Sequence, residues 1–174
     1  GNRSILAHPR DFRVVQHINK MIKSRDFWMP FAPSILDRRA GDYIENPKEL
    51  SSPYMMLTFG GTPLGREELS AACHPYDGTL RPQILERSYN PDYYRLIEAF
   101  EGLTGIGGVL NTSCNLHGEP IVSSPEDAIR MDTGILDLAA YSREAMRLDI
   151  HELMDPSLRK PLTGCSLDFP HQCE

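Results

Sequence analysis

The chain reads Val109-Leu110-Asn111-Thr112-Ser113-Cys114-Asn115-Leu116-His117-Gly118-Glu119-Pro120 where an apolar run gives way to small polar side chains. The run predicts a buried strand over 107–111, and open α/β sheets bind their ligands at strand ends. Hydroxyls and amides can donate to phosphate or carbonyl oxygens without adding charge. The candidate binding residues of this stretch are Asn111, Thr112, Ser113 and Asn115. A polar exit from the strand with local turn hydrogen bonds is the alternative interpretation.

Length and composition indicate one globular domain. The chain has 174 residues, 40% of them apolar and 24% charged, which is ordinary for a folded domain and unlike a disordered or fibrous chain. It has no apolar run long enough for a bilayer and no basic region followed by an apolar signal core, so we expect a cytoplasmic protein without membrane contact. The net charge of −6 argues against nucleic acid as a partner.

The cysteines show no metal-binding pattern. No C-x-x-C pair occurs and no histidine stands at zinc-finger spacing, so we expect neither a structural metal site nor a disulfide. The four cysteines are Cys73, Cys114, Cys165 and Cys173.

Alternating helices and strands predict a single α/β domain around a twisted, mixed sheet flanked by helices. The opening residues carry no cap, so we expect a fragment of a longer protein. We predict an extended segment over 27–33, at a sheet edge or in a loop, and a loop or hairpin over 60–70. Helices are predicted over 11–22 with Asp11 as N-cap, 35–44, 91–103, 124–134 and 142–154. Strands are predicted over 54–59, 69–73, 83–85, 107–111 and 135–139, with a turn at 77–79 and a tail over 155–174.

Two further segments carry cations. Lys23 and Arg25 stand two residues apart at the end of a predicted helix; two cations on one side of an extended segment repel unless an anion lies between them. Arg81 follows the Asp77-Gly78-Thr79 turn, and its planar guanidinium suits bidentate binding of phosphate or carboxylate. The alternatives are a solvated helix end for the first pair and a plain structural turn for Arg81. We expect both segments and the Asn-Thr-Ser stretch to line one pocket for anionic ligands.

Familiar catalytic and nucleotide motifs are missing from the sequence. Ser113 lacks the G-x-S-x-G elbow of a nucleophilic serine. Neither a Walker loop nor a G-x-G-x-x-G fingerprint is present, so a nucleotide would be held in another way.

Six ordered motifs over residues 1–141 nevertheless resemble the C-terminal domain of the NodU/CmcH/TobZ carbamoyltransferases. They are Gly1-Asn2-Arg3-Ser4-Ile5-Leu6, Lys23-x-Arg25 leading to Pro30-Phe31-Ala32-Pro33-Ser34, Ser52-Pro53-Tyr54-Met55, Asp77-Gly78-Thr79-x-Arg81-Pro82-Gln83, Asn90-Pro91 before Tyr93-Tyr94-x-Leu96-Ile97, and Asn111-Thr112-Ser113-x-Asn115 continuing to Gly118-Glu119-Pro120-Ile121-Val122.

The resemblance implies a YrdC-like domain over 1–141, followed by a helix and tail over 142–174. The family's K-x-R and S-x-N motifs fall on Lys23/Arg25 and Ser113/Asn115. Such a domain would form carbamoyl adenylate from ATP, with its Mg²⁺, and carbamoyl phosphate. An N-terminal actin-like ATPase-type domain of the same polypeptide would pass the carbamoyl group to a hydroxyl of a small-molecule acceptor.

The resemblance and the chemistry of the side chains together suggest roles for the candidate residues. We expect Lys23, Arg81 and Ser113 to take part in catalysis, with no protein-held metal. The expected substrate- and nucleotide-binding residues are Arg3, Arg25, Asn111, Thr112 and Asn115. Met29 stands where the family has a second arginine. Two alternatives therefore remain: a binding module without catalysis, and a threonylcarbamoyl-adenylate synthase of the wider YrdC group.

Overall fold

A four-stranded mixed sheet forms the centre of the fold. The computed structural model describes residues 3–23, 29–124 and 126–127. The spatial order of the strands is β1 (Ser4–Ala7), β7 (Gly108–Ser113), β2 (Ala32–Leu36) and β6 (Gln83–Leu85). The β2–β6 pair is parallel, whereas β7 runs antiparallel to both β1 and β2. The predicted mixed α/β architecture is confirmed.

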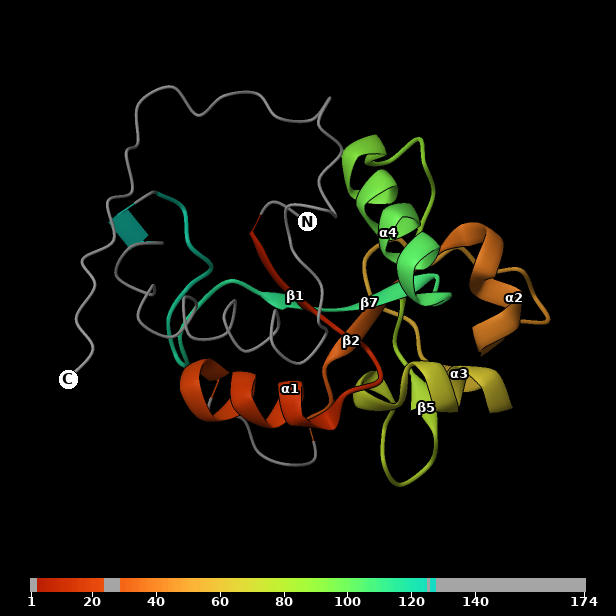
Figure 1. Ribbon diagram of the computed structural model, residues 1–174, viewed down its shortest axis with the longest axis horizontal. Helices are drawn as coiled ribbons and strands as arrows, with labels where there is room; N and C mark the ends of the chain where they lie inside the picture. Colours follow the sequence, from red (N-terminus) through yellow and green to blue (C-terminus); the bar gives the residue numbers. More distant parts are fainter. Residues whose placement is uncertain (1–2, 24–28, 125, 128–174) are drawn as a thin grey trace.

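A second, antiparallel sheet adjoins the first. It contains β3 (Ile44–Glu45), β4 (Phe59–Gly61) and β5 (Thr79–Leu80), with β4 in the middle. The short helices α2 (Ala40–Tyr43) and α3 (Pro63–Glu68) lie beside it (Figure 1).

The helix α1 (Phe12–Ile18) lies on one side of the four-stranded sheet (Figure 1). It forms as the sequence predicts: the Asp11 carboxylate caps it by accepting a hydrogen bond of 2.9 Å from the backbone N–H of Arg13. Val14, Ile18 and Ile22 follow at four-residue steps and are buried in one apolar cluster, because residues four apart share a helix face. A π-helical turn, Asn19–Lys23, continues the helix.

The helix α4 (Pro91–Thr104) packs on the other side, against β2 and β7. Asn90 caps its start by accepting from the backbone N–H of Tyr93, and Pro91 fits the first helical turn. Gly105 ends the helix with a φ of 77°, a left-handed conformation that glycine adopts without steric cost. The predicted helix is confirmed.

Two predictions around β2 hold only in part. The predicted helix over 35–44 begins as strand β2, and only its later residues are helical, in a 3₁₀ turn, Asp37–Arg39, and the four-residue helix α2. In the segment predicted as extended, at a sheet edge or in a loop, residues 29–31 lie outside any helix or strand, whereas Ala32 and Pro33 begin β2, an inner strand of the sheet. Pro33 is tolerated there because pairing with β6 begins only at Ser34.

Three predictions between residues 54 and 73 are wrong. Apolar character alone suggested a strand over 54–59, but only Phe59 belongs to one, and Tyr54 and Met56 are 73% and 80% exposed. The predicted loop over 60–70 contains α3, which Thr62 caps and Pro63 begins. The predicted strand over 69–73 is a 3₁₀ turn, Ser70–Ala72. The strand 83–85, the turn at 77–79 and the 107–111 strand, observed as β7, are confirmed.

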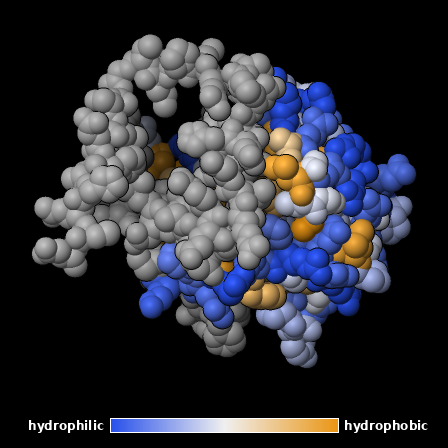
Figure 2. Space-filling model, in the orientation of Figure 1, coloured by the Kyte–Doolittle hydropathy of each residue, from blue (hydrophilic) through white to orange (hydrophobic). Residues whose placement is uncertain are grey.

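Several predictions lie outside the described residues. These are the elements after residue 127, the boundary at 141/142, Arg25, and the cysteines Cys165 and Cys173. Among the described residues, no helix is long and apolar enough to cross a membrane. On the face seen in Figure 2 the described surface is mainly hydrophilic, with separated hydrophobic spots.

Candidate functional site

The structure brings two of the three predicted segments together. Lys23 at the end of the π-helical turn meets the end of β7, and we call Lys23, Ser113 and Asn115 the lysine cluster. The Lys23 ammonium donates to the Asn115 side-chain oxygen at 2.7 Å, to the Asn115 carbonyl at 3.1 Å and to the Ser113 hydroxyl at 3.2 Å. It also donates to the Ser113 carbonyl. These partners stand about 90 positions apart in the sequence.

Further hydrogen bonds fix the lysine cluster. The Ser113 hydroxyl donates to the Asn115 side-chain oxygen at 2.6 Å, and the Asn115 amide donates to the carbonyls of Leu116 and Glu119 at 2.9 and 2.7 Å. The His117 ring nitrogen Nδ1 lies 2.9 Å from the Lys23 carbonyl. Lys23 is only 2% exposed. The cluster is therefore a closed junction between the two segments, and its polar groups are engaged with one another.

Asn111 belongs to a different, buried network. Its side-chain amide donates to the Ser34 hydroxyl at 2.9 Å and to the Tyr93 hydroxyl at 3.1 Å, across β2 and α4. Burial raises the pKa of Tyr93 to about 12. Thr112 is also buried and pairs with Ile5 of β1. Both residues therefore lie within the sheet's packing rather than in the lysine cluster.

Arg3 lies at the neighbouring strand end. Its carbonyl accepts from the backbone N–H of Cys114 at 2.8 Å, and its guanidinium donates to the Val122 carbonyl at 3.3 Å. The exposed Arg3 side chain thus ties the residues after β7 to the start of β1.

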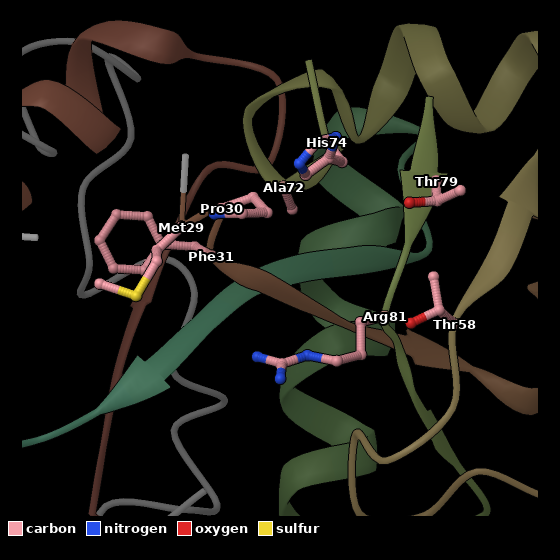
Figure 3. A pocket seen from close by; sticks show the side chains of 8 residues that line it. All are labelled: Met29, Pro30, Phe31, Thr58, Ala72, His74, Thr79 and Arg81. Atoms are coloured by element: carbon pink, nitrogen blue, oxygen red, sulfur yellow. The ribbon is translucent and has the colours of Figure 1, made fainter. Parts of the chain in front are cut away.

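The third segment places Arg81 in a separate pocket of about 300 Å³, the Arg81 pocket (Figure 3). Its other lining residues are Met29, Pro30, Phe31, Thr58, Ala72, His74 and Thr79. Figure 3 shows Met29 and Phe31 on the side opposite Thr58 and Thr79. The Arg81 guanidinium is exposed and has no hydrogen-bond or ion-pair partner in the described part of the chain.

A tight turn presents Arg81 to the pocket. The backbone of His74 and Thr79 closes the turn, and Gly78 takes a φ of +69°, which favours glycine. The Asp77 carboxylate accepts from the Thr79 N–H at 2.9 Å and the Thr79 hydroxyl at 2.7 Å. These hydrogen bonds lower the pKa of Asp77. Arg81 thus extends from a turn that the protein holds by its own hydrogen bonds.

The expectation of one shared pocket is met only in part. The described lining of the Arg81 pocket does not include Lys23, Ser113 or Asn115. The two sites are nevertheless linked, because Phe31 and Ala72 of the pocket belong to the same apolar cluster as Ile22, the neighbour of Lys23.

The sequence did not lead us to predict that His74 belongs to the Arg81 pocket. The ring lines the Arg81 pocket, and its Nδ1 lies 3.3 Å from a carboxylate oxygen of Asp77. Thr58 was missed too, because its segment resembled a buried strand. The spacing of three residues between His74 and Asp77, on either side of the predicted turn, was the signal in the sequence that could have indicated this position.

The described residues supply no metal centre. No group of three or more His, Cys, Asp or Glu side chains among them is placed to hold a metal ion. Cys73 and Cys114 are free thiols, and partial burial raises the pKa of each.

The fold and these contacts define a mixed-sheet α/β domain whose candidate site combines cationic side chains with hydroxyl and amide groups. The family model of the carbamoyltransferase C-terminus matches residues 1–141. The chain belongs to this family of carbamoyltransferase C-terminal domains.

Relatives agree with this assignment. An uncharacterized protein of Methanocaldococcus jannaschii is 45% identical over 74% of this chain and 21% of its own length. Nodulation protein NolNO of Sinorhizobium fredii is 41% identical over 74% of this chain and 19% of its own length. The 3'-hydroxymethylcephem-O-carbamoyltransferase of Amycolatopsis lactamdurans is 34% identical over 74% of this chain and 24% of its own length. The chain thus spans about a quarter or less of the curated relatives it matches.

Proposed function

We propose that this chain is the YrdC-like domain of an O-carbamoyltransferase, which forms carbamoyl adenylate from ATP and carbamoyl phosphate. An N-terminal domain of the same polypeptide then transfers the carbamoyl group to a hydroxyl of a small-molecule acceptor. The family supports carbamoyl transfer in general, and the name of the Amycolatopsis relative describes transfer to oxygen. The observation that carries the proposal is the meeting of Lys23 with Ser113 and Asn115.

The chemistry requires cations next to phosphates. Water first cleaves carbamoyl phosphate into carbamate and inorganic phosphate. A carbamate oxygen then bonds to the α-phosphorus of ATP while the bond from that phosphorus to the β-phosphate oxygen breaks, so negative charge grows on the leaving pyrophosphate. Preorganised donors stabilise such charge at the least reorganisation cost. In this proposal the open Arg81 guanidinium contacts phosphate oxygens. The Mg²⁺ of this proposal enters with the nucleotide, bound to its phosphates.

Lys23 has a positioning role in this proposal. Its ammonium donates to oxygens of Ser113, the last residue of β7, and of Asn115 just after it, so it fixes the path of the chain from Ser113 to Asn115. A fixed turn holds Ser113 and the nearby backbone ready for a carbamoyl or phosphate group. Arg25, two residues after Lys23 in the sequence, is the second cation in this proposal.

Pyrophosphate release tests the proposal. The chain, joined to the N-terminal domain that the family resemblance implies, is mixed with ATP, Mg²⁺ and carbamoyl phosphate, and pyrophosphate is measured. We expect release that depends on carbamoyl phosphate and falls at least tenfold in Arg81→Ala. Ser113→Ala should retain weak activity, since Ser113 positions ligands; complete loss with intact binding would point instead to a covalent role.

One observation favours a second candidate, a binding module without catalysis. Met29 lines the Arg81 pocket at the position where the family resemblance implies a second arginine, so in this candidate the pocket has one cation fewer. Such a module would bind ATP and carbamoyl phosphate but release no pyrophosphate. The same assay therefore separates the two candidates.

A further inference from the structure

The imidazole of His74 lines the Arg81 pocket and has no role in the proposed function so far. Figure 3 shows its ring at one edge of the pocket and the Arg81 guanidinium at the opposite edge. Arginine keeps its proton at all ordinary pH values, and the other described lining side chains carry no basic group. Of the described residues that line this pocket, His74 is therefore the one that can accept a proton near neutral pH.

Backbone hydrogen bonds fix the position of His74 at the start of the turn. Its N–H donates to the Thr79 carbonyl at 2.8 Å, and its carbonyl accepts from the Gly78 N–H at 2.9 Å. The Cys73 thiol donates to the same carbonyl at 3.9 Å. The ring therefore belongs to the same hydrogen-bonded turn that presents Arg81 to the pocket.

The two ring nitrogens of His74 have different surroundings. Nδ1 is buried and lies 3.3 Å from a carboxylate oxygen of Asp77, although at this orientation of the ring no hydrogen bond forms. Nε2 has no partner in the described part of the chain, and the side chain as a whole is 32% exposed. A small rotation of the ring lets Nδ1–H donate to Asp77, and catalytic hydrogen bonds often tighten in this way only when the substrate binds. The lone pair that accepts a proton then lies on Nε2.

The charged and titratable groups near the ring allow it both to take up a proton and to release it. Hydrogen bonds within the turn lower the pKa of Asp77, so this group remains a carboxylate near neutral pH and attracts a protonated ring. Arg66, which packs against the turn, and Arg81 across the pocket are positive and oppose that protonation. Burial raises the pKa of the Cys73 thiol, so this neighbour stays uncharged.

The first step of the proposed chemistry releases a proton. When carbamoyl phosphate is cleaved, the oxygen of water bonds to phosphorus, and the bond from phosphorus to the carbamate oxygen breaks. Carbamate leaves with that electron pair. One water proton stays on the inorganic phosphate and the other passes to a base, and a positioned general base speeds such steps by about 10²–10⁴-fold. An anion bound by Arg81 has His74 on the opposite side of the pocket (Figure 3).

We propose that His74 is the general base of this cleavage, with Nε2 taking the proton of the attacking water while Asp77 accepts the hydrogen bond from Nδ1–H. The inference rests on the proposed function, which supplies carbamoyl phosphate as the ligand of the Arg81 pocket. The proton then passes from Nε2 to solvent, so the ring returns to its starting form.

Release of inorganic phosphate from carbamoyl phosphate tests the inference. It is measured on the chain joined to the N-terminal domain, with ATP and Mg²⁺ present, and corrected for spontaneous decay of carbamoyl phosphate. His74→Gln should lower kcat about a hundredfold and leave the KM for carbamoyl phosphate unchanged within about twofold. His8→Gln is the matched control, since His8 is partly buried and does not line the Arg81 pocket, and it should retain wild-type activity.

The pH profile and chemical rescue identify the proton transfer. The wild-type rate should fall as the pH is lowered from about 8 to about 5, the range in which histidine takes up a proton, and His74→Gln should lose this dependence. Added imidazole should restore part of the activity of His74→Ala, because it supplies the missing base. Circular dichroism of each variant confirms folding.

Supplying carbamate separates this role from a structural one. Carbamate formed in ammonium bicarbonate solution bypasses the cleavage, so His74→Gln should then release pyrophosphate at the wild-type rate. Loss of that activity as well would show a structural defect. A raised KM with unchanged kcat would show a binding role only. Either result overturns the inference.

The inference and the proposed function fail in different ways. Unchanged phosphate release in His74→Gln, beside pyrophosphate release by the wild type, overturns the inference but leaves the proposed function intact. His74-dependent phosphate release without pyrophosphate release, even from carbamate, does the reverse. A wild type that releases no phosphate above the spontaneous rate overturns both.

Discussion

The lysine cluster and the Arg81 pocket each contain a basic residue from a sequence motif, but the fold places the two cations in different environments. Lys23 is 2% exposed and donates to oxygens of Ser113 and Asn115. Arg81 is exposed and has no described hydrogen-bond partner. A buried ammonium must be satisfied by the protein, because leaving water without compensation costs several kcal/mol. An exposed guanidinium has no such need and can serve a ligand.

This contrast assigns different roles to the two regions. The lysine cluster joins the end of the π-helical turn to the end of β7, so its main effect is on the shape of the site. The Arg81 pocket combines a cation and threonine hydroxyls with an apolar side, so its main effect is on binding. The predictions below test this division.

The largest effect is expected on stability, from Lys23→Met. This change preserves much of the side-chain volume but removes the ammonium that donates to oxygens of Ser113 and Asn115. We expect the free energy of unfolding to fall by about 1–3 kcal/mol in denaturant titrations. Lys20→Met is the matched control, because Lys20 is exposed, and should change stability by less than about 0.5 kcal/mol. Equal stability of the two variants would show that the cluster is not a structural junction.

Arg81→Ala should lower the affinity for ligand rather than the stability of the fold. We expect the affinity for carbamoyl phosphate to fall about tenfold to a hundredfold, the loss of a charge-assisted contact, with little change in unfolding. Arg10→Ala is a suitable control, since Arg10 pairs with Glu67 on the surface and does not line the Arg81 pocket. A lower Tm with unchanged affinity would contradict the division of roles.

Met29→Arg adds a second cation to the Arg81 pocket and so tests whether this pocket binds anions. The Met29 side chain is 43% exposed at the Arg81 pocket, so an arginine has access to water and to a bound anion. We expect about tenfold tighter binding of carbamoyl phosphate, measured by calorimetry. Met56→Arg, on a residue that is 80% exposed and does not line the Arg81 pocket, controls for the added charge. Equal gains in both variants would indicate a nonspecific charge effect.

The smallest effect concerns pH and the turn that presents Arg81. Hydrogen bonds from Thr79 hold the pKa of Asp77 below its ordinary value. A carboxyl whose pKa is lower in the folded state stabilises the fold above its unfolded pKa, about 3.9, and this contribution is lost as pH falls through the folded pKa. Asp77→Asn should therefore be slightly less stable than the wild type near pH 6, and the difference should vanish well below pH 4. Urea titrations over that range measure it; a difference independent of pH would contradict the charge effect.

Local signals in the sequence predicted the helices α1 and α4 and the strand β7 well. Asp11 and Asn90 cap α1 and α4, and apolar residues at helical spacing bury one face of each. The strand β7 follows from its apolar run. Caps and periodicity act within a few residues, so no knowledge of the fold is needed to read them.

The segment 54–73 shows where such reading fails. Tyr54 and Met56 are apolar enough for a strand, yet both side chains are exposed to solvent. The α3 helix was overlooked because the glycines before it suggested a loop, although Thr62 and Pro63 form a good helix start. In the candidate site, proximity of Lys23 to Ser113 and Asn115 was expected, whereas the separate position of Arg81 and the burial of Asn111 were not.

The amino-acid sequence by itself determined the family, the helices α1 and α4, the strand β7 and the set of polar residues available for chemistry. Only the tertiary structure decided which of these polar residues are hydrogen-bonded within the protein and which stay open to a ligand. Lys23 and Asn111 find hydrogen-bond partners from distant segments, while Arg81 finds none among the described residues. The physical reason is that burial and hydrogen bonding between residues tens of positions apart depend on how the strands pair, which no local pattern encodes.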